Sequence, residues 1–127
     1  PFTEQGCTLF VKLRGLQPDE RQRSVRSLAD DEWRPGSAPG LSVMPLAGHG
    51  AEHAAFVRWQ PGTRFLPHRH FGGEEIYVLD GVFSDDKGHY PAGTWLRSPH
   101  LSMHHPFSDS GCTIYVKTGH LPTEKTR

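Results

Sequence analysis

Two histidines and a carboxylate lie close together in the stretch PGTRFLPHRHFGGEEIYVLDG, residues 61–81. His68 and His70 are two residues apart on an expected strand, so both side chains leave one face and can reach one ion. The two glycines that follow allow a tight turn, after which Glu74 or Glu75 opens the next strand and can return a carboxylate to the same ion. Imidazole and carboxylate groups together suit divalent metals. The stretch therefore predicts a metal site.

The elements that must position these residues are short strands. Apolar runs are separated by PG, GG, DG and KG steps, which mark turns, and this pattern indicates an all-β sandwich or barrel. The runs are LSVMPL, HAAFVRW, RFLPHRH, EEIYVLDGVF and GTWLRSP. Only residues 17–31 are rich in charge, and they are expected to form a linker, with a helix from Asp19 to Leu28 as the alternative.

Composition sets the broad class. The 127 residues suit a single domain, and 14 Lys plus Arg balance 14 Asp plus Glu, which argues against nucleic acid or an anionic membrane as the partner. No apolar run has the length of a membrane span, and the two cysteines do not form a disulfide framework. We therefore expect reduced thiols in a soluble, cytoplasmic protein.

The chain also repeats itself. PFTEQGCTLFVKLRGL at residues 1–16 matches PFSDSGCTIYVKTGHL at residues 106–121, with an offset of 105 residues. Both copies contain a strand-like run, Gly6–Leu13 and Gly111–Thr118, rich in β-branched and aromatic residues. The first copy is either the end of a preceding repeat or an extra strand of a single domain.

A known family matches these patterns. Gly62, His68-x-His70, Glu74 and Gly81 have the spacing of the first cupin motif. The run GGEEIYVLDGVFSDDKGHYPAGTWLRSP, followed by S-x-H-x-P and GCTIYVK, resembles the ChrR-type cupin family over residues 33–121. That family includes cupin domains of anti-sigma factors and relatives of acetylacetone-cleaving dioxygenases. The resemblance implies a cupin double-stranded β-helix, a jelly roll.

The resemblance also selects the remaining ligand. In the family pattern the ligand histidine lies two residues after Ser and two before Pro, which is His104, so His100 and His105 are bystanders. The implied set is His68, His70, Glu74 and His104 around one divalent metal, Zn or Fe first and Mn or Ni as further choices. Three histidines without Glu74 are the alternative, and Glu75 is expected on the other face of the sheet.

The resemblance further implies a domain layout. Residues 1–16 would be the last strand of a preceding cupin repeat, 17–32 a linker, 33–121 the cupin domain and 122–127 a tail. The chain would then be the second lobe of a tandem bicupin. We also expect a homodimer or an intramolecular docking of residues 1–16, because an unpaired strand seeks a neighbour.

Two functions follow from the resemblance. The first is a metal-binding sensor module that perceives a small molecule or an oxidant. It would reach a sigma factor only through a separate domain, because this sequence has no Cys-x-x-Cys. The second is an Fe(II) dioxygenase that cleaves β-dicarbonyl compounds, and a third, plainer reading is a structural lobe. The sequence identifies no catalytic residue and leaves open whether the chain is an enzyme.

Overall fold

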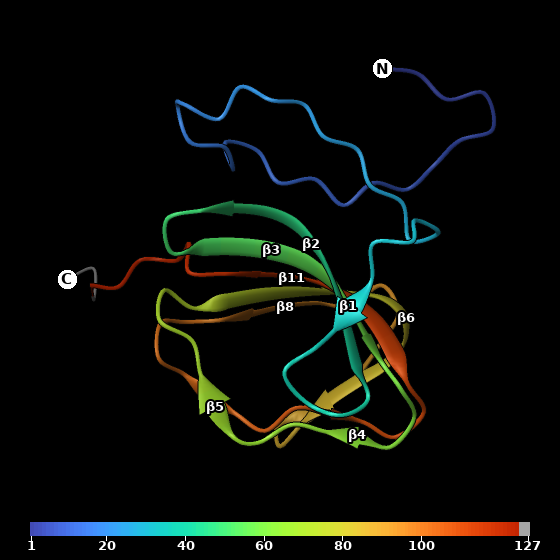
Figure 1. Ribbon diagram of the computed structural model, residues 1–127, viewed down its shortest axis with the longest axis vertical. Coiled ribbons are helices and arrows are strands. Elements are labelled where there is room, and N and C mark those ends of the chain that lie inside the picture. Colours follow the sequence, from blue (N-terminus) through green and yellow to red (C-terminus); the bar gives the residue numbers. More distant parts are fainter. Residues whose placement is uncertain (125–127) are drawn as a thin grey trace.

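The protein is built from β-strands. The computed structural model describes residues 1–124, and within them there is no helix, so none that could cross a membrane (Figure 1). The predicted tail, 122–127, falls partly outside the described residues. The strands are β1 (Arg34–Pro35), β2 (Leu41–His49), β3 (Glu52–Trp59), β4 (Thr63–Arg64), β5 (His68–Arg69), β6 (Glu74–Asp85), β7 (Gly88–Pro91), β8 (Trp95–Ser98), β9 (Met103–His104), β10 (Phe107–Ser108) and β11 (Cys112–Thr118).

The strands form one curled sheet and one short ribbon. The large sheet has the order β1-β2-β3-β11-β6-β10-β4, with β7 and β8 also paired to β6, and the ribbon joins β5 to β9. Figure 1 shows β2, β3, β11, β6 and β8 as a broad layer, with β4 and β5 on the opposite side of the interior. The all-β fold class is confirmed.

The core lies between these layers. Trp59, Ile76, Val78, Phe83, Cys112 and Ile114 form one buried cluster. Buried and half-buried residues alternate over residues 76–79 of β6 and 112–115 of β11, as expected where strands turn one face to an interior. Cys112 is buried and free, as the sequence suggested for a reduced thiol.

The prediction of one continuous strand between β3 and β6 is wrong. The run RFLPHRH divides into β4 and β5, and residues 65–67 between them are not in a strand. Pro67 has no amide hydrogen and cannot donate to a neighbouring strand, which explains the interruption. His68 therefore starts a strand of two residues, and His70 lies just after it.

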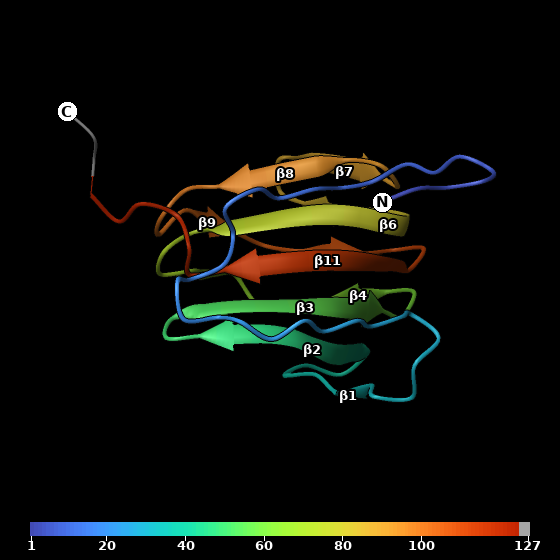
Figure 2. The same cartoon turned by 90° about the horizontal axis from the view of Figure 1, so that it is seen from above.

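The first 33 residues cross the outer face of the sheet. No strand begins before Arg34, so the predicted strand Gly6–Leu13 is not paired with any strand of the described chain. Residues 6–16, here called the strap, run along β6 and β8 and then cross the end of β11, and the linker returns over β2 and β3 (Figure 2). Phe10 stacks on Tyr77 with ring centroids 4.7 Å apart, and Lys12 Nζ donates to Glu75 Oε2 at 2.7 Å. The strap docks through its side chains, not by adding to a sheet edge.

Candidate metal centre

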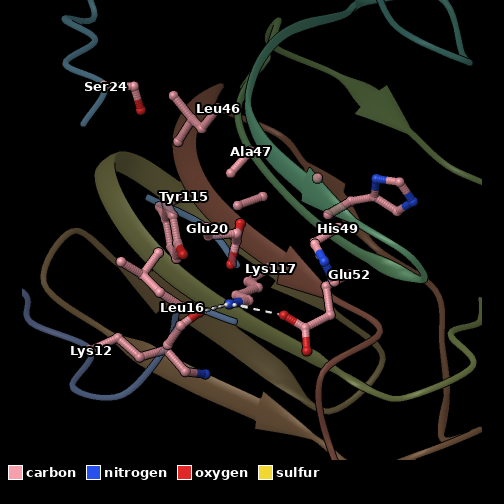
Figure 3. A pocket seen from close by; sticks show the side chains of 14 residues that line it. Lys12, Leu16, Glu20, Ser24, Leu46, Ala47, His49, Glu52, Tyr115 and Lys117 are labelled. Carbon is pink, nitrogen blue, oxygen red and sulfur yellow. Dashed lines mark hydrogen bonds and ion pairs between the residues drawn. The ribbon is translucent and has the colours of Figure 1, made fainter. Parts of the chain in front are cut away.

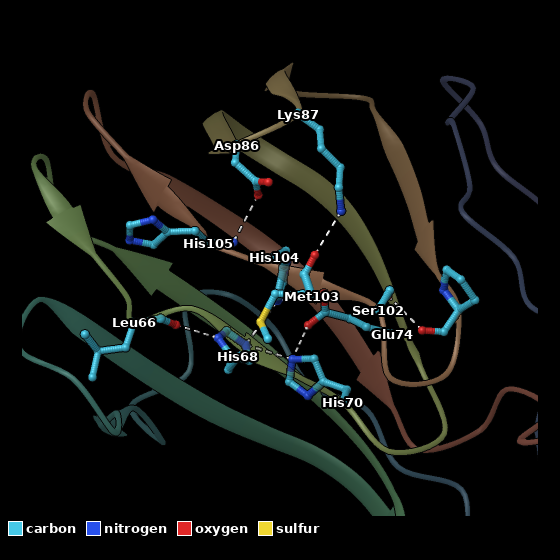
Figure 4. Close-up of polar contacts among 11 residues, drawn as sticks. Leu66, His68, His70, Glu74, Asp86, Lys87, Ser102, Met103, His104 and His105 are labelled. Carbon is cyan, nitrogen blue, oxygen red and sulfur yellow. Dashed lines mark hydrogen bonds and ion pairs between the residues drawn. The ribbon is translucent and has the colours of Figure 1, made fainter.

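Three histidines meet inside the curled sheet. In the β5–β9 ribbon His68 lies directly opposite His104, so the two side chains project from one face. His70 follows β5 and points back to the same place (Figure 4). His68 Nε2 lies 2.9 Å from His70 Nε2 and 3.0 Å from His104 Nε2. All three ligand atoms lie within 4.8 Å of one another, the separation that one ion could bridge.

Glu74 lies against this histidine cluster from the first position of β6. Its Oε2 is 3.0 Å from His70 Nε2, and its Oε1 is 3.7 Å from His104 Nε2. The residue is only 5% exposed, and Oε1 has no hydrogen-bond donor among residues 1–124. A buried carboxylate oxygen without a donor is costly, and a cation beside it would remove that cost.

A glycine turn sets the distance between His70, which follows β5, and the carboxylate of Glu74 at the start of β6. Gly72 and Gly73 have φ of +71° and +68°, and a Cβ on either would approach neighbouring atoms to 2.6 Å. Only glycine adopts this backbone without strain. The turn thereby returns the chain to the ion site within four residues of His70.

The ring nitrogens are oriented for metal binding. His68 Nδ1 donates to the Leu66 carbonyl at 2.9 Å, which leaves Nε2 with a lone pair facing the cluster. Burial lowers the pKa of His104, although the charge of Glu74 acts in the opposite direction, and the lowered pKa favours the neutral ring. Neutral imidazole is the form that binds metals. The Leu66 carbonyl was not identified from the sequence, because a backbone group leaves no residue-type signal.

The other candidate histidines lie elsewhere. His105 is exposed, and its backbone amide bonds Asp86 Oδ1 at 3.2 Å. His100 Nδ1 accepts from the Gly72 amide at 2.8 Å, which supports the turn but directs the ring away from the cluster. Glu75 points to the outer face, where it meets Lys12, as strand alternation predicted.

An apolar cavity of about 180 Å³ opens beside the histidines. Besides the three histidines and Glu74, its lining is mainly aliphatic and aromatic: Leu41, Val43, Val57, Trp59, Phe65, Ile76, Phe83, Pro106, Ile114 and Val116. Arg58 packs over Trp33 at 3.8 Å, and Arg97 lies 3.8 Å from Glu75 on the outer face. Within the described residues neither arginine lines this cavity.

Comparison with known proteins agrees with this geometry. The model of the ChrR cupin-like domain family matches residues 21–122. The anti-sigma-E factor ChrR of Cereibacter sphaeroides is 32% identical over 88 residues, which are 68% of this chain and 40% of that protein. This chain therefore corresponds to well under half of its curated relative.

Two solved structures extend the comparison. The crystal structure of Rhodobacter sphaeroides SigE in complex with the anti-sigma ChrR superposes with a TM-score of 0.64 at 26% identity, over 73% of this chain and 51% of that one. An acetylacetone dioxygenase from Acinetobacter johnsonii gives a TM-score of 0.70 at 15% identity, over 81% and 78% of the two chains, which shows a shared fold. The jelly-roll expectation is confirmed, and the chain belongs to the family of ChrR cupin-like domains.

Proposed function

We propose that this chain is a metal-binding sensor cupin that holds one divalent ion with His68, His70, His104 and Glu74. The convergence of three Nε2 atoms within 4.8 Å supports this proposal. The buried, donor-free Oε1 of Glu74 supports the fourth ligand independently. Three imidazoles and one carboxylate suit Zn or Fe first and Mn or Ni next. When bound, such an ion would supply a Lewis-acid centre at the end of the apolar cavity.

The cavity indicates the class of signal. Its walls are apolar apart from the ligand cluster, Ser37 and Thr118, and no lysine or arginine of the described part of the chain lines it. A charged group of a ligand would have to lie at the proposed metal ion, because burying a charge against the apolar walls would be costly. We propose that the signal is a small molecule with a mainly apolar body, or an oxidant such as a peroxide, which would reach the ligand side chains directly.

Contact with a sigma factor is proposed to lie outside these residues. The solved relative is a complex of SigE with the anti-sigma ChrR, and this chain covers 51% of the matched chain. The strands described here place the histidine cluster in the interior, so a bound sigma factor would sense it indirectly. We further propose a cytoplasmic location, since both cysteines are free.

Metal content after anaerobic purification tests the site. One equivalent of a divalent metal is expected in the unmodified protein, and none in His68→Ala or His104→Ala. His105→Ala is the matched control, because His105 is the adjacent histidine and is exposed. If His105→Ala loses the metal and His104→Ala keeps it, the ligand assignment is wrong. If neither His68→Ala nor His104→Ala loses the metal, the proposed metal site is rejected.

A dioxygenase is the second candidate, and the cavity is the observation that favours it. An apolar space of about 180 Å³ adjoining the histidines could accept a small β-dicarbonyl compound. Within the described cavity lining, Glu74 is the one carboxylate that could move a proton. Oxygen uptake by the Fe(II)-loaded protein with acetylacetone would support this activity. If the protein holds one equivalent of metal but takes up no oxygen, the dioxygenase is rejected and the sensor function remains the proposal.

A further inference from the structure

The outer face of the sheet carries a row of apolar side chains, which is unusual for a face in contact with solvent. Met44, Phe56, Tyr115, Tyr77 and Trp95 are successive cross-strand partners from β2 to β8. Sheets with one buried and one solvated face normally place polar residues outside. Trp95 is 50% exposed although it ends this row. The face therefore has the composition of a packing surface.

The strap repeats β11 in backbone as well as in sequence. Gly6 and Gly111, which are 105 positions apart, have φ of +79° and +85°. Arg14 and Gly119 are also 105 positions apart and have φ of +56° and +81°. Positive φ is rare for arginine, so its recurrence at the matching position indicates that residues 6–14 keep the shape of a cupin closing strand.

The strap exposes residues whose counterparts in β11 and just after it are buried. Ile114 and Leu121 are 3% and 8% exposed, whereas their counterparts Leu9 and Leu16 are each 72% exposed. Cys112 is buried, and Cys7 is exposed. Phe10 and Lys12 of the strap, whose counterparts in β11 lie on its outer face, instead face the sheet below. One side of the strap packs on the sheet. Its other side carries apolar residues that are exposed to solvent, although their counterparts in this barrel belong to the core.

We infer that residues 6–13 are the closing strand of a second cupin barrel, which packs back to back on the outer face of this one. Leu9, Val11 and Cys7 would enter the core of that barrel as Ile114, Val116 and Cys112 enter the core of this one. The inference does not depend on the metal site, which lies on the opposite face of the sheet.

A pseudo-two-fold axis along the strands would relate the barrels. Figure 2 shows the strap running in the same direction as β11 and lying over β6. Phe10 meets Tyr77, and Lys12 meets Glu75. By the same symmetry, Tyr115 and Lys117 of this barrel would meet an aromatic residue and a carboxylate of the second barrel. The observed contacts of Phe10 and Lys12, the counterparts of Tyr115 and Lys117, are the half of this pairing that the described chain contains.

The outer face of β11 beside the strap is not fully covered. A cavity of about 250 Å³ separates the strap from the linker and is lined by Tyr115 and Lys117 together with residues of β2 and β3 (Figure 3). Lys117 Nζ contacts Glu52 at 3.4 Å and donates to the Gly15 carbonyl at 3.2 Å. The symmetry places the second barrel's equivalent of β6 over this space.

Duplication of the chain tests the inference. Residues 17–105 are repeated ahead of Pro1, so that residues 1–16 can close the added repeat. The only cysteines remain Cys7 and Cys112. Burial raises the pKa of Cys112 to about 11, so its reaction with Ellman's reagent is slow. Cys7 should react fast in the 127-residue chain and more than about 100-fold more slowly in the duplicated chain.

Two variants of the duplicated chain separate the closing strand from the docking. Leu9→Asp should restore fast reaction at Cys7, because a charge cannot enter the added core. Tyr77→Lys in the second repeat should leave Cys7 slow but enlarge the radius of gyration in X-ray scattering. Phe71→Lys is the aromatic control, since Phe71 packs on His100 and not on the outer face.

Three results would overturn the inference. Fast reaction of Cys7 in the duplicated chain would show that the strap closes no barrel. A slow Cys7 with a scattering profile of two separated barrels would reject back-to-back packing. A slow Cys7 in a dimer of the 127-residue chain would assign the surface to a second copy, the homodimer that the sequence also suggested.

Discussion

At the residue scale, the neighbours Glu74 and Glu75 have separate roles on the two faces of β6. Glu74 lies among the histidines, and Glu75 lies beneath the strap. Glu74→Gln keeps the shape but removes the charge, so metal affinity should fall at least about 10-fold. Competition with a chromophoric chelator measures the change. Glu75→Gln is the matched control, and an equal loss there would contradict the assignment of Glu74.

Acid stability should report on Glu75. Burial opposes its ionisation, but the Lys12 hydrogen bond and charge, with a smaller contribution from His120, outweigh burial and hold the pKa of Glu75 below its ordinary value of 4.5. The stabilisation is therefore present above pH 4.5 and lost as pH falls through the lower folded value. Lys12→Met should cost about 1 kcal/mol at pH 7 and flatten this part of the profile. Urea unfolding from pH 3 to pH 7 measures both, and an unchanged profile would exclude the pair as the cause.

At the element scale, the turn between β5 and β6 controls the site. Gly72 has φ of +71°, and a Cβ there would lie 2.6 Å from the Gly119 backbone. Gly72→Ala should destabilise the fold by about 2–3 kcal/mol and lower metal affinity, because His70 and Glu74 would move apart. Gly50→Ala is the control, since its φ is +58° but no atom of the described residues lies within 4 Å of the added Cβ, and it should cost about 1 kcal/mol. Equal effects in denaturant unfolding would show that the close approach is unimportant.

Much of this element pattern could be predicted from the sequence. Alternation and turn glycines are local signals, so β2, β3, β6, β8 and β11 were each expected near their observed bounds. Histidine spacing and the S-x-H-x-P pattern singled out the residues that the fold brings together. The division at Pro67 was missed, because a proline can also sit at a strand edge. The unpaired strap was missed too, since pairing depends on a partner that propensity does not specify.

At the scale of the whole molecule, the metal would join two separate sheets. Its proposed ligands come from the β5–β9 ribbon and its flank and from β6 of the large sheet. A ribbon of two residues per strand has little stability of its own. Metal at 100 times its dissociation constant should raise the unfolding free energy by about 2.7 kcal/mol. Thermal unfolding with and without EDTA measures this, and His104→Ala should abolish the difference. A chelator effect that persists in His104→Ala would place the metal elsewhere.

The adjacent glutamates of β6 also bear on how faithfully the strand aligns during folding. A slip of β6 by one residue would exchange Glu74 with Glu75 and still leave a carboxylate on each face, so the charges cannot detect the error. The same slip would turn Tyr77 inward and bring Ile76 and Val78, which are 3% and 0% exposed, out to solvent. The register of β6 is thus determined by the burial of Ile76 and Val78 and by Tyr77, which faces the strap. Glu74 and Glu75 contribute little to it, because a carboxylate would lie on each face in either register.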